Sequence, residues 1–505
     1  MQENIKEIEQ SFLSLVKKMS SYGEAISLMF WDLRTGAPKK GVEQRSETIG
    51  TLSSEVFNMS VSEEMGGYLE ALSAPEVQGE LSDITKKMVE VTKKEYDKNK
   101  KIPADEYKEF VILTSKAESA WEEAKENADF VGFSPYLEKI VDYLRKYVER
   151  IGYEGHPYNA LLDDYEPGVT VDVLDRVFGE LREKLVPLVK AVTEAPTQPK
   201  TDFLFEHFSK EKQNAFSLDI LKQLQYDFQA GRLDTTVHPF AATINRNDVR
   251  ITTKYDEKDF RTAIFGTIHE CGHALYEQNI AEELIGTPLC DGTSMGIHES
   301  QSLFCENFVG RNYSFWKKNY SLLKEYSNGQ FDDVSLDDFY KAINVAGPSL
   351  IRIEADEMTY SLHIILRYEI EKALISGEIE VKDLPQIWND KMEEYLGIRP
   401  SHDGEGVLQD VHWSGGALGY FPSYALGYIY ASQIKNKMNE AIPNYDELLE
   451  AGDFTPIKEW LVQNVHQYGK MKKPLEIIQD ITGEGLNPKY LVEYLEQKYK
   501  AVYEL

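Results

Sequence analysis

Apolar residues recur at spacings of three and four along most of this chain, and this periodicity limits the possible folds more than any other feature. Near the N-terminus the residues that follow it are Ile5, Ile8, Phe12, Leu15 and Val16. Side chains at this spacing lie on one face of an α-helix. Similar patterns cover residues 40–97, 103–127, 133–152 and 172–194. The chain is therefore predicted to be mainly α-helical.

Proline residues mark the expected ends of these helices. Pro103, Pro135 and Pro157 fall between the helical patterns, and a proline favours the start or the end of a helix because it lacks a backbone N–H. No internal repeat and no low-complexity linker interrupts the series. We therefore expect a single domain over residues 1–505, in which an N-terminal helical region of roughly 1–200 forms a lid over the region 201–505.

One region departs from the helical pattern. Residues 235–255 are rich in Thr, Val, Ile and Phe, and the polar stretch 245–248 lies in their middle. This combination is typical of a short β-hairpin or of two small strands. A strong helical pattern, residues 257–280, follows directly.

The charge of the chain excludes some classes of partner. With 85 acidic and 55 basic residues, the formal net charge is −30. A field of this sign repels phosphate backbones and anionic membranes, and we find no basic patch that would offset it. Neither nucleic acid nor a membrane is therefore an expected partner.

Cysteine usage and the terminal sequence indicate the cellular compartment. The only cysteines are Cys271, Cys290 and Cys305, a set that does not make a disulfide framework. The N-terminus carries acidic residues among its lysines and has no apolar signal core. The longest apolar stretch, residues 419–431, is too short and too rich in Tyr to span a bilayer. We expect a soluble, cytoplasmic protein.

The helical pattern 257–280 contains an H-E-x-x-H motif, with His269, Glu270 and His273 as its fixed residues. Residues four apart on a helix point the same way, so both imidazoles can reach one metal ion. A divalent ion lowers the pKa of a water molecule and polarises a scissile carbonyl. Glu270 is placed to act as the general base that takes the proton of that water and passes it to a leaving amine.

Two other residues of this motif indicate packing. The side chain of Cys271 points about 100° away from that of His269, so we expect it in the core. Gly272 lies in the middle of the predicted helix, where Gly costs about 1 kcal/mol relative to Ala. Close approach of another element would explain this glycine.

A catalytic zinc site usually takes three protein ligands, so a third ligand is expected downstream. The candidates are Glu277, His298, Glu299 and Glu306. Glu277 lies on the helix of the two histidines, where its geometry is poor. A carboxylate from a second amphipathic helix that begins at His298 fits better, but spacing alone does not separate Glu299 from Glu306.

Several short motifs occur in the order in which the carboxypeptidase Taq family of metallocarboxypeptidases has them, and the chain resembles that family over nearly its whole length. Besides the H-E-x-x-H helix and Trp31-Asp32, they are His238-Pro239-Phe240, Asp248-Val249-Arg250-Ile251-Thr252, His298-Glu299-Ser300-Gln301, Ile351-Arg352-Ile353-Glu354-Ala355-Asp356 and Gly406-Val407-Leu408-Gln409-Asp410-Val411-His412-Trp413. Each motif is weak alone, but their shared order is specific.

This resemblance implies a fold, an activity and a third ligand. It implies a mainly helical fold like that of neurolysin and the angiotensin-converting enzymes, with a deep groove. It implies Glu299 as the third ligand, one divalent ion per chain (zinc or cobalt) and a homodimer. The implied activity is the release of C-terminal amino acids from peptides with broad specificity.

Two arginines lie in these motifs. A carboxypeptidase needs a cation for the free carboxylate of its substrate, and the planar fork of Arg suits a carboxylate best. We expect Arg352 to be this receptor and Arg250 to support it. The alternative is a structural ion pair of either arginine with Asp248 or Asp356.

An oxyanion must also be stabilised. His412 and Tyr420 look like the His and Tyr pair that related helical metallopeptidases use, and Tyr424 competes with Tyr420 for the role. Packing in the core is the alternative for each. His238 either lines the groove or is an ordinary strand histidine, and Trp31-Asp32 is expected to pack among the N-terminal helices.

Three other functions remain open. An oligo-endopeptidase with the same metal chemistry would cut internal bonds and accept a blocked C-terminus. A catalytically silent peptide-binding protein would not need Glu270, and a purely structural helical protein would not need the ligands.

Overall fold

A computed structural model describes residues 2–505 of the chain. Its N-terminal part is made of α-helices, which are α1 (Gln2–Thr35), α2 (Val42–Ser60), α3 (Glu63–Leu72), α4 (Pro75–Gln78), α5 (Asp83–Asn99), α6 (Ala104–Asn127), α7 (Phe130–Ile151), α8 (Asn159–Tyr165) and α9 (Val171–Thr193). The mainly helical prediction is confirmed, and the pattern 40–97 is divided among α2 to α5.

One predicted boundary is wrong. Pro103 directly precedes α6 and Pro157 lies between α7 and α8, but Pro135 lies inside α7. A proline there removes the N–H that would bond to the carbonyl of Val131, four residues earlier. The hydroxyl of Ser134 donates to that carbonyl instead, at 3.1 Å. The helix therefore continues through the proline.

A small sheet follows. Its strands are β1 (Leu233–Thr235), β2 (Ala241–Asn245) and β3 (Asp248–Thr253), in the order β1-β3-β2. β2 and β3 form the predicted antiparallel hairpin, and β1 adds a third, parallel strand that was not predicted. Both strands of the hairpin contact α11 (Arg261–Gln278), and β2 also contacts α1, so the sheet joins the N-terminal helices to the centre of the molecule.

The remaining helices build the body of the molecule. They are α10 (Lys210–Gln223), α12 (Met295–Leu303), a π-helical turn η4 (Phe304–Gly310), α13 (Tyr313–Tyr326), α14 (Leu336–Ile343), α15 (Tyr360–Ser376), α16 (Leu384–Leu396), α17 (Pro422–Ala441), α18 (Tyr445–Ala451), α19 (Thr455–Asn464), α20 (Pro474–Thr482) and α21 (Lys489–Tyr503). Short 3₁₀ turns are Lys39–Gly41, Asp202–Phe205, Glu282–Leu284, Arg352–Glu354, Val381–Asp383 and His466–Met471.

Helix α12 is clamped between α11 and α17 at the centre of the core. An added Cβ on Gly272 of α11 would lie 2.3 Å from the carbonyl oxygen of Gln301. One on Gly427 of α17 would lie 2.7 Å from Cβ of Glu299. The expectation that Gly272 permits close approach of another element is therefore confirmed. Because the three helices are buried on most sides, the polar side chains between them need partners.

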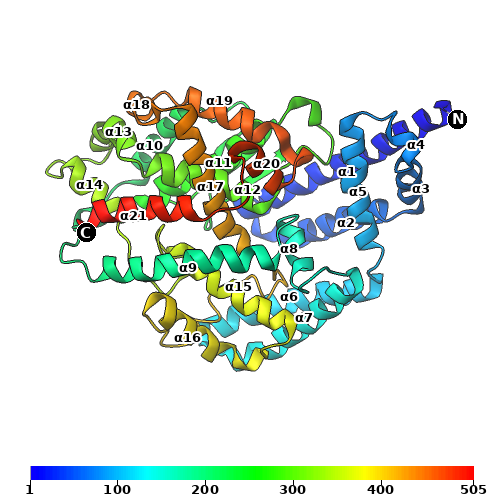
Figure 1. Ribbon diagram of the computed structural model, residues 1–505, viewed down its shortest axis with the longest axis horizontal. Helices are drawn as coiled ribbons and strands as arrows, with labels where there is room; N and C mark the ends of the chain where they lie inside the picture. The colour runs from blue at the N-terminus through cyan, green and yellow to red at the C-terminus, as the bar shows by residue number, and fades with distance from the viewer. Residues whose placement is uncertain (1) are drawn as a thin grey trace.

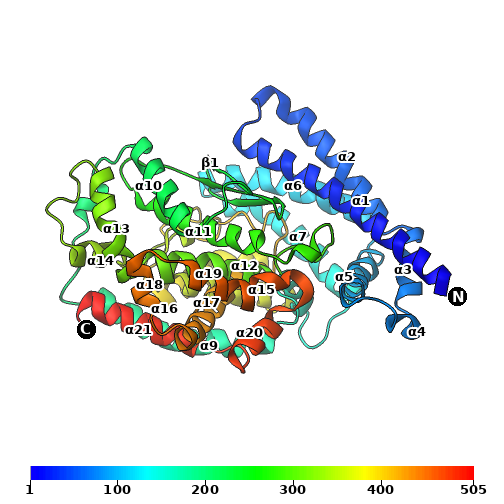
Figure 2. The same ribbon diagram turned by 90° about the horizontal axis from the view of Figure 1, so that it is seen from above.

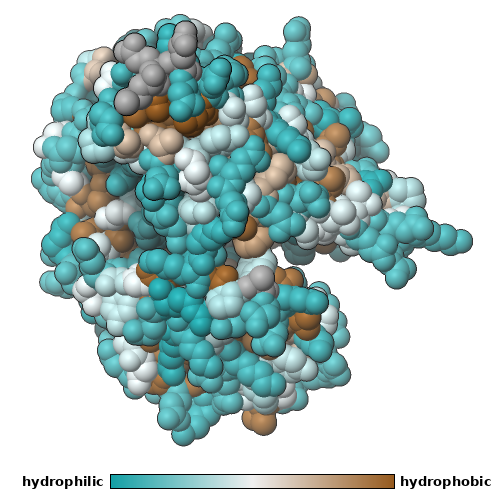
Figure 3. Space-filling model, turned by 90° about the vertical axis from the view of Figure 1, so that its right-hand side faces the viewer, coloured by the Kyte–Doolittle hydropathy of each residue, from teal (hydrophilic) through white to brown (hydrophobic). Residues whose placement is uncertain are grey.

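The views of the molecule show how these parts meet. In Figures 1 and 2, α1 and α2 form a long hairpin that extends from the body at the N-terminal end. The surface in Figure 3 is deeply hollowed between the part that holds this hairpin and the part that holds α6 and α7. No helix among residues 2–505 has both the length and the apolar character needed to cross a membrane.

Candidate metal centre and catalytic groups

Three side chains converge where α11 meets α12. His269, His273 and Glu299 each offer one ligand atom, and these atoms lie within 4.8 Å of one another. Oε2 of Glu299 lies 3.7 Å from Nε2 of His269 and 3.5 Å from Nε2 of His273. Two imidazole nitrogens and one carboxylate oxygen are ligands that suit zinc and other divalent ions, and three protein ligands leave a position open for water.

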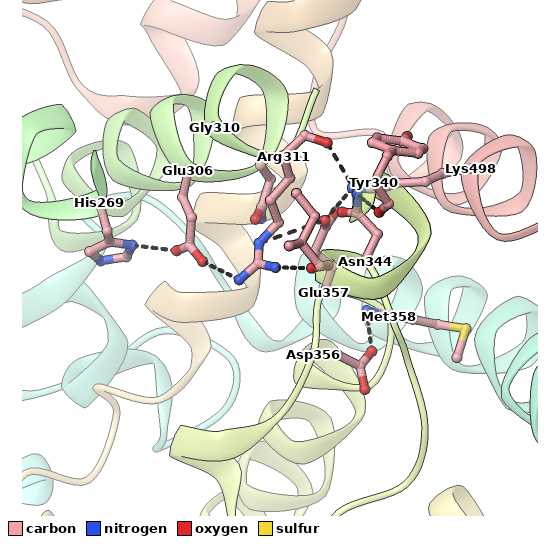
Figure 4. A network of polar contacts seen from close by, with 12 residues as sticks. His269, Glu306, Gly310, Arg311, Tyr340, Asn344, Asp356, Glu357, Met358 and Lys498 are labelled. Carbon is pink, nitrogen blue, oxygen red and sulfur yellow. Dashed lines mark hydrogen bonds and ion pairs between the residues drawn. The ribbon is translucent and has the colours of Figure 1, made fainter. Parts of the chain in front are cut away.

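His269 is held from its other side by Glu306. Nδ1 of His269 lies 3.0 Å from Oε2 of Glu306, and the second oxygen of Glu306 accepts a hydrogen bond from Nη2 of Arg311 at 3.0 Å (Figure 4). Burial alone would raise the pKa of Glu306, but these two partners lower it to about 2. The carboxylate therefore accepts an N–H from Nδ1, so Nε2 is the nitrogen available to a metal ion.

A histidine holds His273 in the same way. Nδ1 of His273 lies 2.6 Å from Nδ1 of His298, and Nε2 of His298 lies 3.0 Å from Oε1 of Glu277. Glu277 accepts the N–H of Nε2, and against the effect of burial this contact raises the pKa of His298. In its neutral form the His298 ring has only an acceptor at Nδ1. His273 must then donate from Nδ1, and its Nε2 keeps a free lone pair toward Glu299.

All four residues that spacing offered as third ligand are therefore found at this centre. Only Glu299 joins the two histidines directly, whereas Glu306 and His298 contact the far nitrogens of the two rings and Glu277 supports His298. Residues seven apart on an α-helix share a face, which is why sequence spacing could not separate Glu299 from Glu306. In the structure Glu299 belongs to α12 and Glu306 to the π-helical turn η4, and both approach α11.

The protonation of the histidines reflects the surrounding carboxylates. Burial disfavours a charged His269, yet Glu299 and the hydrogen bond to Glu306 raise its pKa to about 10. Burial lowers the pKa of His273 to about 4. Two carboxylates thus face one imidazole, an excess of negative charge that a divalent cation would neutralise.

Glu270 lies beside the ligands without belonging to the cluster. It is 7% exposed, and burial raises its pKa to about 7. A carboxylate with a pKa in this range can accept and return a proton near neutral pH. Cys271, between the two histidines, is fully buried, as expected of a core residue.

Arg352 lies in a buried ion cluster. Its Nε donates to Oδ1 of Asp410 at 2.9 Å, and Nε of Arg367 donates to Oδ2 of the same carboxylate at 2.7 Å. Asp410 is largely buried, but the two guanidinium groups hold its pKa well below its usual range. Two cations face one carboxylate, so the cluster keeps one net positive charge.

Asp356, named as a neighbour for Arg352 in the ion-pair alternative, is not its partner. Asp356 accepts hydrogen bonds from the backbone N–H of Gly347 and from the hydroxyl of Thr359 instead. Asp410 belongs to the motif of residues 406–413, but its spacing indicated no role for it. Arg367 lies outside all of these motifs. The requirement that a buried charge be paired was the signal that could have identified Asp410.

Arg250 is held in a structural arrangement. Its guanidinium donates twice to Asp248, at 2.7 Å each, and stacks over the ring of Trp31 at 4.4 Å from the centroid. Trp31 thus contacts the sheet, while Asp32 pairs with Arg45 of α2 as packing among the N-terminal helices requires. This arrangement favours the ion-pair alternative for Arg250.

His238 is exposed in the loop between β1 and β2. Among residues 2–505, no hydrogen bond or ion pair joins it to the other candidate site residues.

His412 and two tyrosines form an aromatic cluster next to Arg352. Nε2 of His412 lies 3.3 Å from the hydroxyl of Tyr424, and the ring of Tyr420 lies 5.5 Å from that of His412. Burial lowers the pKa of His412 to about 4, so the ring is neutral at pH 7. Burial and the charge of Glu299 raise the pKa of Tyr420, which places Tyr420 within electrostatic reach of the metal ligands.

Tyr360 was missed at the level of sequence. Its hydroxyl lies 3.4 Å from Nη1 of Arg352, and its ring lies 6.2 Å from that of Tyr424. It follows the motif of residues 351–356 by four positions, and nothing in its spacing marks it.

The fold and this centre define a metallopeptidase, and comparison with known proteins specifies which one. Residues 11–499 match the family described as Carboxypeptidase Taq (M32) metallopeptidase. The chain belongs to this family and is a metallocarboxypeptidase. Membership implies a divalent metal ion, and the His-His-Glu group of α11 and α12 fits one.

Several relatives match over their whole length. "Carboxypeptidase 1" of Bacillus subtilis is 60% identical and covers 98% of this chain and 99% of its own. "Thermostable carboxypeptidase 1" of Thermus thermophilus is 39% identical, with 98% of each chain covered. The crystal structure of the M32 carboxypeptidase from Deinococcus radiodurans is 35% identical and has a TM-score of 0.96, with 99% and 100% coverage.

Proposed function

We propose that this protein removes C-terminal residues from peptides one at a time, with broad side-chain specificity. The observation that carries the proposal is the net positive charge of the Arg352–Asp410–Arg367 cluster. Beside it lies the aromatic cluster that contains Tyr420, whose pKa is raised by burial and by the charge of Glu299. A free C-terminal carboxylate is the part of a peptide that such a charge attracts. In this proposal Arg352 binds the carboxylate of the substrate. Arg250 has a supporting role, because it holds α1 against the sheet.

We propose His269, His273 and Glu299 as the ligands of one ion, zinc or cobalt. The bound ion would lower the pKa of the attacking water and polarise the scissile carbonyl. Glu270 then accepts the proton of the water and returns it to the leaving amine. Glu306 and the His298–Glu277 pair keep both ligand rings in the tautomer that leaves Nε2 free.

The aromatic cluster is proposed to stabilise the oxyanion. His412 is neutral and, with its Nε2 facing the hydroxyl of Tyr424, can carry its proton on the otherwise unpartnered Nδ1 or on Nε2. Tyr420 and Tyr424 each carry a hydroxyl donor close to His412, so either can stabilise developing negative charge. His238 is exposed on the loop before β2 and does not belong to this aromatic cluster. Any contact of His238 with substrate would therefore lie away from the oxyanion.

The setting of the enzyme is also a proposal. We infer a homodimer in the cytoplasm, supported by the family and by three unpaired cysteines. We also propose that residues 1–505 act as one peptidase domain in which the region of roughly 1–200 limits access to the centre in 201–505. The hairpin of α1 and α2, which borders the hollow in Figure 3, supports this.

The decisive experiment offers the metal-loaded protein one unstructured peptide in two forms, a free acid and a C-terminal amide, with products read by mass spectrometry. A ladder of single-residue losses from the acid, with the amide intact, is expected. Internal cuts in both forms would instead identify an endopeptidase. The Glu270→Gln variant controls for contaminating proteases, and equal cleavage by that variant would remove Glu270 from the mechanism.

A further inference from the structure

A second polar cavity lies behind the metal centre. It has a volume of about 540 Å³ and opens between η4, α14, α17 and α21. Arg311 lines this cavity and also donates to Glu306, which holds His269 (Figure 4). The cavity is therefore separated from the metal ligands by only two side chains.

The floor of the cavity contains polar groups without partners. Asn307 is 4% exposed, and its side-chain amide has no hydrogen bond to any of residues 2–505. The Nε of Arg311 is buried and likewise has no acceptor, and the nearest carboxylate oxygen, on Glu357, is 4.0 Å away. A buried donor such as Nε of Arg311 is costly unless something binds it. The amide of Asn307 is open to a hydrogen bond with a ligand.

Two of the three cations that line the cavity are held in ion pairs. Arg311 pairs with Glu306, and Lys498 pairs with Glu357. Lys435, the third cation, makes no ion pair within residues 2–505. Its ammonium donates to the side-chain oxygen of Asn439 and lies 3.6 Å from the centroid of the Tyr445 ring. Lys435 is thus the lining cation that no direct ion pair holds, and Asp446 is the carboxylate whose charge acts on it.

The rim has the opposite charge. Asp446 and Glu493 line the mouth of the cavity, and both are exposed. Aromatic side chains also line the cavity, namely Phe308, Tyr340, Tyr490 and Tyr494. The cavity therefore combines buried or half-buried cations with aromatic side chains and with two exposed carboxylates.

We propose that this cavity binds a free α-amino acid, with its carboxylate at Lys435 and Asn307 and its ammonium toward Asp446 and Glu493. The acidic mouth disfavours a phosphate or another multiply charged anion, while an amino acid complements both ends. The aromatic walls suit a large apolar side chain. Free amino acids are also the product class of the proposed reaction, but the binding site does not depend on that reaction.

Calorimetric titration of the metal-loaded protein with L-phenylalanine and with L-phenylalaninamide tests this assignment. Phenylalanine is expected to bind, and the amide, which lacks the carboxylate, at least about tenfold more weakly, because a hydrogen bond to a charged group is lost. Sodium acetate, a carboxylate without an ammonium, is expected to bind more weakly as well. Equal binding of acetate and phenylalanine would overturn the assignment of an amino acid.

Variants locate the site. Lys435→Gln is expected to weaken phenylalanine binding about tenfold or more, and Asn307→Asp to abolish it by repulsion, while Lys435→Arg retains it. Arg352→Gln, at the catalytic centre, is expected to leave this binding unchanged. Binding that survives in Lys435→Gln and disappears in Arg352→Gln would place phenylalanine at the catalytic centre and overturn the proposal, as would the absence of binding to the wild type.

A crystal structure with phenylalanine supplies the second measurement. Phenylalanine in the cavity beside Lys435 is expected, and a cavity that stays empty while phenylalanine binds elsewhere would overturn the proposal. Neither measurement uses peptide cleavage, so failure of the proposed catalytic function would not be mistaken for failure of this one.

Discussion

The Nδ1 atoms of His273 and His298 lie 2.6 Å apart, and Glu277 holds the far side of His298 at 3.0 Å. One metal-facing histidine is thus oriented by a second histidine, whereas the other, His269, is oriented by the carboxylate of Glu306. Both arrangements have the same chemical result, because each engages Nδ1 and leaves Nε2 facing Glu299. The two supports differ in charge, and they can be tested separately.

Replacing His298 with Phe removes the acceptor for the N–H of His273. The unpaired N–H would be buried and the ring free to turn, so metal affinity is expected to fall about 10- to 100-fold. Competition with a chromophoric chelator measures this. His402→Phe, on the surface, is the control. Unchanged affinity in His298→Phe would mean that His298 does not orient the ligand.

Glu306→Gln tests the other support. The amide cannot match a carboxylate as acceptor from His269, and Arg311 would lose its counterion, so metal affinity is expected to fall about 10- to 100-fold. The same chelator competition applies, with the exposed Glu283→Gln as control. If Glu306→Gln binds the metal as tightly as the control Glu283→Gln, the role of Glu306 is confined to neutralising Arg311.

The clamp around α12 predicts opposite effects for two glycines of α11. Gly272→Ala would place a methyl group 2.3 Å from the carbonyl oxygen of Gln301 and is expected to cost about 1–3 kcal/mol of unfolding free energy. At Gly266 an added Cβ meets nothing within 4 Å, so Gly266→Ala is expected to be neutral or to stabilise by up to about 1 kcal/mol. Urea unfolding compares them, and equal effects would contradict the clamp.

Arg352→Gln is expected to lower kcat/KM for peptides with a free C-terminus about 10- to 100-fold, because a charged hydrogen bond to the substrate is lost. Metal affinity is expected to stay the same. The exposed Arg399→Gln is the matched control. Should Arg352→Gln cleave the free acid as well as the wild type does, Arg367 would be the next receptor to test.

Glu371 makes stability depend on pH. Burial raises its pKa to about 7, although Tyr158, Gly419 and Trp413 donate hydrogen bonds to it. Because the folded state binds this proton more tightly than the unfolded state, the stabilisation is complete below about pH 4.5 and is lost as pH rises through about 7. Between pH 5 and pH 8 this carboxyl is expected to reduce stability by about 2.5 kcal/mol.

Glu371→Gln tests that prediction. The variant is expected to be less stable at pH 5, because the amide cannot accept all three hydrogen bonds, but its stability should fall less between pH 5 and pH 8. Urea unfolding at the two pH values measures the difference. Identical pH dependence in variant and wild type would show that Glu371 keeps an ordinary pKa.

Some features of this protein follow from local sequence alone. The spacing of apolar residues determined the helices, and the alternation of Thr, Val and Ile determined the β2–β3 hairpin. The four-residue spacing in α11 determined that His269 and His273 face one point, because helix geometry leaves no alternative. Gly272 marked the closest approach of α12, since a side chain there would collide with its backbone.

Other features were decided only by tertiary structure. The packing of α12 between α11 and α17 brings Glu299 to the two histidines, and the π-helical turn η4 that follows brings Glu306 behind His269. Asp410 rather than Asp356 pairs with Arg352, across 58 positions of the chain. The direction of a side chain on its own helix depends only on local backbone geometry, so sequence spacing predicts it. The pairing of buried charges depends on distance in space, which hydrophobic periodicity does not encode.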